Sequence, residues 1–173
     1  PTRRSSDLKE VFNLSANDEF QAQVALYKDT VFRIAYSYSR NSADAEDIAQ
    51  EVFLKLFRYE KPFPASEQEK AWLIRVTMNQ SKDHLRKRWL RTFFLPEEAA
   101  TPVSAAAPQT DVLEAVLSLP VRYRMAVHLY YYEDYAVREI AEILSCSETA
   151  VQTRLQRGRA MLKEKLGEEF DDE

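Results

Sequence analysis

The sequence predicts an all-α protein built as two small helical domains, an N-terminal helical bundle and a C-terminal helix-turn-helix, joined by a flexible linker. Three observations support this fold class. Only 2 of the 173 residues are glycine, which disfavours the hairpins and phosphate-binding loops that need positive φ. Apolar residues recur at helical spacing in several segments. A stretch rich in Ala, Pro and Thr divides these segments into two groups.

The N-terminal domain is expected over residues 1–92 and begins with two amphipathic helices. In the first, at about 18–40, apolar residues recur at spacings of four and three: Phe20, Val24, Tyr27, Val31, Ile34 and Tyr38. The second, at about 43–58, can be capped by Asn41 or Ser42. Its inward positions are expected to be Ile48, Ala49, Val52, Phe53 and Leu56.

Prolines bound the third helix and the linker. Pro62 and Pro64 end the second helix region, because proline cannot continue a helix. A third helix is expected at about 67–91, apolar in its first half and basic in its second. Pro96, Pro102 and Pro108 exclude a long helix from residues 93–110, which we interpret as the linker.

The C-terminal domain is expected over residues 111–173 and ends in an acidic tail. Its helices are predicted at 112–119, 121–132, 137–144 and 148–166. Pro120 suits a helix start. Ser145 and Cys146 form a tight turn in which Ser145 is expected to adopt φ > 0, and Ser147 can cap the last helix. This spacing predicts a helix-turn-helix.

Local charge points to a polyanion partner although the formal net charge is −4. Residues 82–91 contain five basic side chains against one acid, and residues 154–165 repeat that ratio. On the last helix, a set of polar and basic residues faces outward, in reach of base edges and phosphates: Ser147, Thr149, Gln152, Thr153, Arg154 and Arg157. An isolated basic helix is more often a solvated surface, but the preceding helix and turn favour DNA binding.

The third helix presents a second candidate nucleic-acid surface. Asn79, Asp83 and Arg86 share one face, and Arg88 and Trp89 follow. Basic residues beside an aromatic ring suit a partly opened strand, on which bases stack while charges follow the phosphates. A solvated helix end is the alternative.

The acidic second helix raises the possibility of an enzyme. Its acids could bind Mg²⁺, as in helical nucleotide pyrophosphohydrolases, but no second helix supplies a facing pair. Neither His84 nor His128 lies in a catalytic or metal-binding motif, so both are interpreted as surface or packing residues. The single Cys146 is expected to be a small buried filler. We predict no metal and no cofactor, and the residues alone do not favour an enzyme, although the hydrolase stays an alternative.

Three stretches together resemble bacterial extracytoplasmic-function (ECF) sigma factors of the sigma-70 family, over about residues 20–166. Residues 44–53 resemble the segment that binds core RNA polymerase. Residues 72–88 resemble the promoter −10 segment, and residues 119–159 resemble the −35 domain. Their order, with a Pro/Ala linker between the second and third, makes the resemblance specific.

The resemblance implies a transcription initiation factor whose domains bind RNA polymerase core and promoter DNA. By analogy, Asp47, Gln50 and Glu51 face the clamp helices of the β′ subunit, and the C-terminal domain contacts the β flap. The −10 strand would meet four residues of the third helix, and the loop at 59–66 would help hold an extruded base. Those four are Asn79, Asp83, Arg86 and Arg88. The −35 duplex would meet the outward set on the last helix, and an anti-sigma factor is a further implied partner.

Two departures and two alternatives remain. The family often has Gly where this chain has Ser145, and usually Lys where it has Gln152, so the preferred −35 sequence is not implied. A helix-turn-helix regulator that never binds polymerase, or a Mg²⁺-dependent helical hydrolase, would each explain part of the pattern. Without an apolar run of about 18 residues or a signal-peptide core, the chain is expected to be cytoplasmic, with no membrane insertion.

Overall fold

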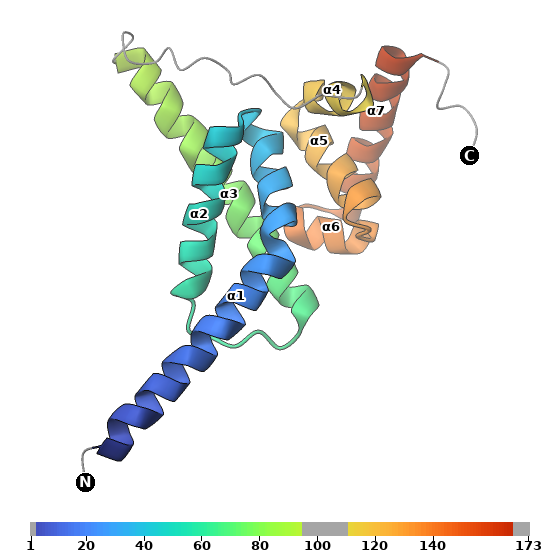
Figure 1. Ribbon diagram of the computed structural model, residues 1–173. Coiled ribbons are helices and arrows are strands. Elements are labelled where there is room, and N and C mark those ends of the chain that lie inside the picture. Colours follow the sequence, from blue (N-terminus) through green and yellow to red (C-terminus); the bar gives the residue numbers. More distant parts are fainter. Residues whose placement is uncertain (1–2, 95–110, 168–173) are drawn as a thin grey trace.

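A computed structural model of the chain describes residues 3–94 and 111–167, and within these ranges all regular structure is helical. The helices of the first half of the chain stand beside those of the second half (Figure 1). The predicted all-α class is confirmed. The acidic tail beyond Gly167 lies outside the described residues.

The N-terminal helices are α1 (Arg3–Ser39), α2 (Ser42–Phe57) and α3 (Ser66–Phe94). α1 begins well before the expected start near residue 18, because residues 3–17 contain no Pro or Gly to stop a helix. α3 extends to Phe94 and so includes the first two residues of the predicted linker 93–110. The rest of the linker, 95–110, lies outside the described residues.

The core of the N-terminal bundle is formed by the predicted helical faces. Val31 on α1, Ile48 and Val52 on α2, and Leu73 on α3 are at most 1% exposed. Burial of aliphatic side chains from three helices is the main stabilising term in a bundle of this size. Phe53, also expected inward, is only partly buried and lies at the edge of this core.

The C-terminal helices are α4 (Asp111–Ser118), α5 (Val121–Val127), α6 (Val137–Leu144) and α7 (Glu148–Leu166). α5 continues directly into a π-helical turn, η1 (His128–Tyr132), where the sequence predicts a continuous α-helix. Pro120 occupies the N-cap position of α5, as predicted. The core of this domain includes Leu119, Leu129, Ile140 and Val151, each fully buried.

The α5–α7 contact depends on one glycine. Gly158 is buried, and a Cβ built on it would lie 2.8 Å from Cγ2 of Val127. A hydrogen in place of a side chain therefore lets the two helices approach closely.

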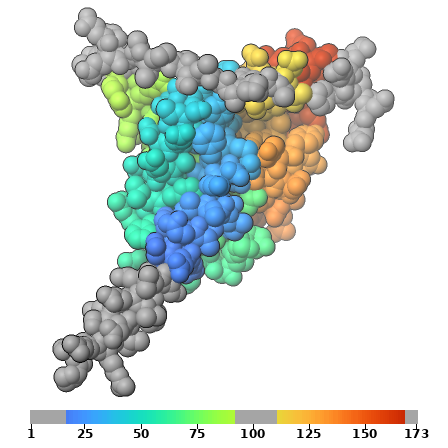
Figure 2. All heavy atoms as spheres, in the orientation of Figure 1, coloured from blue at the N-terminus to red at the C-terminus, as the bar shows by residue number. Residues whose placement is uncertain are grey.

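The two domains pack directly against each other. One continuous apolar cluster includes Ile34 and Ile74 from the N-terminal bundle together with Leu129 and Ile140 from the C-terminal domain, all fully buried. α1 contacts α5, and α3 contacts α6. Figure 2 shows the helices of the C-terminal domain packed against those of the N-terminal bundle. The flexible linker predicted from sequence did not indicate this contact.

Candidate nucleic-acid interface

The acidic face of α2 is available to a partner. Asp47, Gln50 and Glu51 are exposed, while Ile48 and Val52 face the bundle core. The bundle's own packing therefore does not use these three side chains. The structure places them on one helix face, as the spacing predicts.

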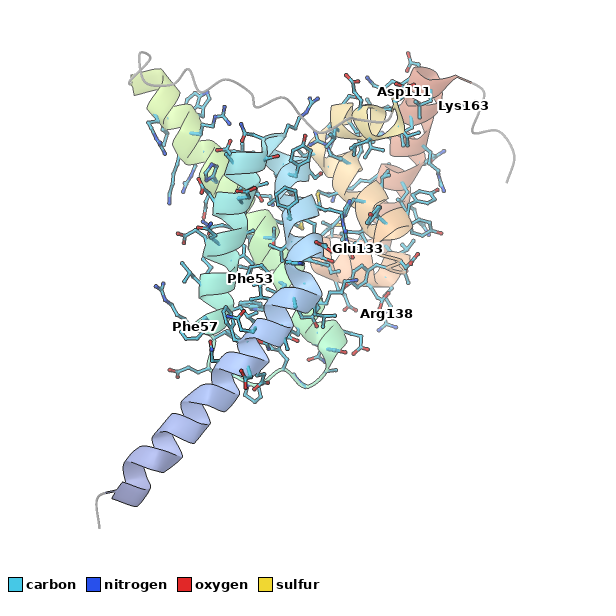
Figure 3. The ribbon with its side chains drawn as sticks, viewed as in Figure 1. Phe53, Phe57, Asp111, Glu133, Arg138 and Lys163 are labelled. Carbon is cyan, nitrogen blue, oxygen red and sulfur yellow. The ribbon has the colours of Figure 1, made fainter. Side chains whose placement is uncertain are left out.

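An apolar groove runs beside this face between α1 and α2. It has a volume of about 650 Å³ and includes Gln50 in its lining, with apolar walls from Phe20, Val24, Phe32, Phe53 and Leu54. Figure 3 marks Phe53 and Phe57 on α2; Phe57 is 62% exposed. An apolar groove with exposed acids at its side suits a partner helix that is both apolar and basic.

Asp44 holds α2 against α3. Its carboxylate accepts a hydrogen bond from Arg88 and lies 3.1 Å from Nε2 of His84, and its backbone N–H donates to Oδ1 of Asn41 at 3.1 Å. The predicted Asn41 cap is thus confirmed. His84, interpreted as a surface or packing residue, instead bridges two helices. Among residues 17–91 and 111–167, no three His, Cys, Asp or Glu side chains gather into a metal site.

The predicted −10 residues lie along the second half of α3. Asn79, Asp83 and Arg86 are exposed, and Arg86 lies 3.4 Å from Asp83. Arg88 is half-buried by its ion pair with Asp44. This ion pair therefore holds the Arg88 guanidinium in one orientation. The ion pair of Arg86 with Asp83 is exposed and contributes little to stability.

Aromatic rings fill the loop between α2 and α3. The rings of Tyr59 and Phe63 stack with centroids 4.8 Å apart, and the ring of Trp72 on α3 packs against both at a tilt, with centroids 4.7 and 5.5 Å away. They border a cavity of about 460 Å³ whose opposite wall is formed by α6. Stacked rings at a loop offer a platform for an unpaired base.

The α6–α7 pair has helix-turn-helix geometry. Ser145 ends α6 in the left-handed region with φ 52° and ψ 49°, and the N–H of Cys146 donates to the carbonyl of Ala141 at 3.0 Å. The side chain of Ser147 accepts a hydrogen bond from the N–H of Ala150 at 3.1 Å and caps α7. The predicted turn and cap are both confirmed. Cys146 is partly buried in this turn.

Replacing Ser145 with glycine is expected to stabilise the protein by about 1 kcal/mol, because glycine has no Cβ to oppose positive φ. Thermal unfolding of Ser145→Gly should show a melting temperature raised by about 4 °C. Ser145→Ala, which keeps the Cβ, is the control and should give no such gain. A melting temperature lowered by Ser145→Gly would contradict the left-handed assignment.

The predicted −35 residues share one surface of α7. Ser147, Thr149, Gln152 and Arg157 are exposed, and Thr153 and Arg154 are partly exposed. The hydroxyl of Thr153 donates to the carbonyl of Thr149 at 2.9 Å, so it is already used within the helix. Gln152 and Arg157 are the longest fully exposed side chains of the set.

Two tyrosines support the basic face of α7, which the sequence did not indicate. Arg157 donates to the hydroxyl of Tyr123 at 3.5 Å, and this hydrogen bond lowers the pKa of Tyr123. Arg159 donates to the hydroxyl of Tyr131 at 3.2 Å. The partners are 34 and 28 residues away in the chain, so no local pattern could reveal them.

Across residues 3–94 and 111–167, no helix is long and apolar enough to cross a membrane.

Comparisons with known proteins match both halves of the chain. The family model Sigma-70 region 2 matches residues 24–91, and Sigma-70, region 4 matches residues 109–162. The RNA polymerase sigma factor CarQ of Myxococcus xanthus is 31% identical, over 92% of this chain and 95% of its own length. The ECF RNA polymerase sigma factor SigW of Bacillus subtilis is 29% identical, over 86% of this chain and 89% of its own.

Solved structures show the same fold. The sigma factor RpoE from Bartonella quintana, solved in complex with the anti-sigma factor NepR, gives a TM-score of 0.72 at 23% identity, covering 87% of this chain and 98% of that one. CnrH in complex with the cytosolic domain of CnrY gives 0.60 at 23% identity, covering 87% and 88%. The two matched regions and the relative at 31% identity exclude the helical hydrolase and the regulator without a polymerase-binding region. The chain belongs to the ECF sigma factors of the sigma-70 family, which are not enzymes but transcription initiation factors that bind RNA polymerase and direct it to promoters.

Proposed function

We propose that this sigma factor works through three surfaces, each on a different helix. The face of α2 formed by Asp47, Gln50 and Glu51 binds the clamp helices of the polymerase β′ subunit. The second half of α3 engages the non-template strand of the −10 element through Asn79, Asp83, Arg86 and Arg88. The outward set on α7, Ser147, Thr149, Gln152, Thr153, Arg154 and Arg157, binds the −35 duplex.

The geometry of the α6–α7 turn is the observation that carries this proposal. A left-handed Ser145 and a capped α7 project the helix N-terminus and one polar face away from the domain core. A helix presented in this way fits the major groove, with its first turns near base edges and its later basic residues near phosphates. The domains we propose for these tasks are residues 1–92 and 111–173.

Variants of α7 test the −35 assignment. Arg157→Ala should weaken binding to all duplexes and reduce the salt slope by about one unit, since one phosphate contact is lost. Gln152→Ala should change preference at one base position by roughly 1 to 3 kcal/mol. Titration of −35 duplexes with single base changes at several salt concentrations measures both quantities. Equal losses from the two variants on a scrambled −35 element would contradict the assignment.

One further partner follows from the family. Similar sigma factors have been solved in complex with an anti-sigma factor, NepR, and with the cytosolic domain of CnrY. We propose that an anti-sigma factor also holds this chain. Because core polymerase and promoter DNA are cytoplasmic in bacteria, we propose that the protein acts in the cytoplasm.

A further inference from the structure

A buried carboxylate lies at the boundary between the two domains. Glu133, directly after η1, is 3% exposed at its side chain and meets three residues of the N-terminal bundle. Lys70 on α3 lies 2.9 Å from its Oε2, Arg33 on α1 lies 3.6 Å from its Oε1, and Thr30 donates to Oε2 at 3.4 Å. Figure 3 shows Glu133 beside α1. We call Glu133, Lys70, Arg33 and Thr30 the ionic latch.

The cations of the latch also contact aromatic rings of the C-terminal domain. The Arg33 guanidinium stands 4.6 Å from the ring centroid of Tyr132, and the Lys70 ammonium 5.4 Å from that of Tyr135. Cation–π contacts of this kind are attractive and add to the ion pairs. Lys70 and Arg33 therefore each make two contacts across the domain boundary, one with Glu133 and one with an aromatic ring.

The latch carboxylate is ionised at neutral pH. Burial alone would raise the pKa of Glu133, but hydrogen bonds from His128 and Lys70 and their charges outweigh burial and lower it to about 2. An ionised carboxylate in such a site depends on its cationic partners, because an unpaired buried charge is strongly unfavourable. When the domains part, water can replace those partners and solvate the carboxylate.

The closed arrangement also restricts the −10 surface. The cavity beside the stacked rings is walled on one side by Trp72 and Arg75 and on the other by Glu139 and Glu142 of α6. Two carboxylates thus stand opposite a basic residue of α3, where a DNA strand would have to enter. Their negative charge opposes a phosphate backbone at this position.

The two DNA surfaces are too close together to bind both elements of one promoter. Asn79 lies one helical turn beyond Arg75, Arg75 faces α6 across the cavity, and α6 packs on α7. Helix rise and helix packing distances keep the surfaces within roughly 40 Å of each other. Elements centred near −10 and −35 lie about 25 base pairs, or roughly 85 Å, apart along B-form DNA.

We propose that the ionic latch holds the free sigma factor in a closed, inactive arrangement, and that loading onto a promoter requires Glu133 to leave Lys70 and Arg33. This inference rests on the proposed assignment of α3 and α7 to the two promoter elements.

Spin-label distances test the latch without polymerase. In a Cys146→Ser background, labels at Ala43→Cys on α2 and Glu164→Cys on α7 report the separation of the domains, since both positions are exposed. Glu133→Gln and Lys70→Gln remove one charge from opposite sides of the boundary. Each substitution should change the distribution of distances between the two labels from a narrow one centred at a short distance to a broad one centred at a longer distance. The double variant should add little, because either change alone breaks the same contact.

The matched control is Asp134→Asn. It removes the same charge one residue away, at an exposed position with φ 57° that asparagine tolerates, and should leave the distance unchanged. Circular dichroism should show equal helicity in all variants. Since Lys70→Gln leaves the C-terminal domain intact, it keeps the test valid if Glu133→Gln unfolds that domain.

Transcription gives the functional readout. Run-off assays with core polymerase should reach half-maximal transcription at a roughly five- to tenfold lower concentration of either latch variant, because more of the free protein is competent to bind. Unchanged distances would overturn the latch, and longer distances with no gain in transcription would overturn its inhibitory role. A wild-type chain inactive with every core polymerase and promoter would instead contradict the proposed function, while the distance result would stand.

Discussion

The double substitution Asp47→Lys with Glu51→Lys is expected to reduce affinity for core polymerase by orders of magnitude. Both side chains are exposed and unused by the bundle, so helicity and melting temperature should remain nearly unchanged. At an interface with basic clamp helices, each reversal replaces an attraction with a repulsion. Loss of one buried partner in such a pair costs roughly 2 to 5 kcal/mol. Transcription should fail at every promoter alike, since docking precedes promoter choice.

Asp18→Lys with Glu19→Lys is the matched control for this result. It makes the same change in net charge on exposed residues of α1, outside the set Asp47, Gln50 and Glu51. Polymerase affinity measured by fluorescence anisotropy or surface plasmon resonance should fall for the first pair and change little for the second. Equal affinity of the Asp47 and Glu51 variant and the wild type would disprove the role of α2 in docking.

Replacing Gly158 with leucine is expected to destabilise the C-terminal domain by about 3 kcal/mol or more. A single Cβ already falls 2.8 Å from Val127, whose β-branched side chain has little rotamer freedom in a helix. Leucine adds three more carbon atoms beyond Cβ, and these must push α5 and α7 apart. Such overpacking also disturbs the packing of neighbouring side chains. Because small domains are stable by only about 5 to 15 kcal/mol, this loss removes a large part of the free energy of unfolding and should lower the melting temperature strongly.

Ala160→Leu provides the comparison, because Ala160 is exposed on the same helix two residues later. It adds the same kind of side chain without entering the α5–α7 contact, and leucine is a good helix former. Thermal and urea unfolding should therefore separate the two variants clearly. Equal unfolding midpoints would show that α5 and α7 can move apart without cost.

Local features of the fold could be predicted because they are encoded within a few residues. The spacing of Tyr27, Val31 and Ile34 gives the buried face of α1, and Ser147 gives the start of α7. The glycine-like conformation of Ser145 follows from the length of the turn. Exposure of Asp47, Gln50 and Glu51 follows from their position opposite the apolar face of α2. Their role with polymerase remains a prediction.

Features that depend on distant residues could not be predicted in this way. Glu133 and Thr30 are 103 residues apart, and neither has a pattern that names the other. Asp44 and Arg88 are also far apart in the sequence, and no local pattern indicates that they form an ion pair. This ion pair fixes the guanidinium of Arg88 at the basic end of α3. The sequence does not identify Gly158 as a close-packing position, because a glycine inside a helix indicates close packing only when the opposite helix is known. The π-helical turn at η1 likewise lacks a distinct periodicity over five residues.

Both tryptophans of the chain lie on α3, and this gives the protein an intrinsic optical probe of its own domain arrangement. Trp89, 64% exposed near the end of the helix, already emits into water. Trp72 is partly shielded by Tyr59 and Phe63 and borders the cavity under α6. Parting of the domains removes α6 from the Trp72 side of that cavity, so the indole becomes more exposed to water and its emission shifts to the red. The protein in its natural sequence thus reports, without labels, when its two halves separate.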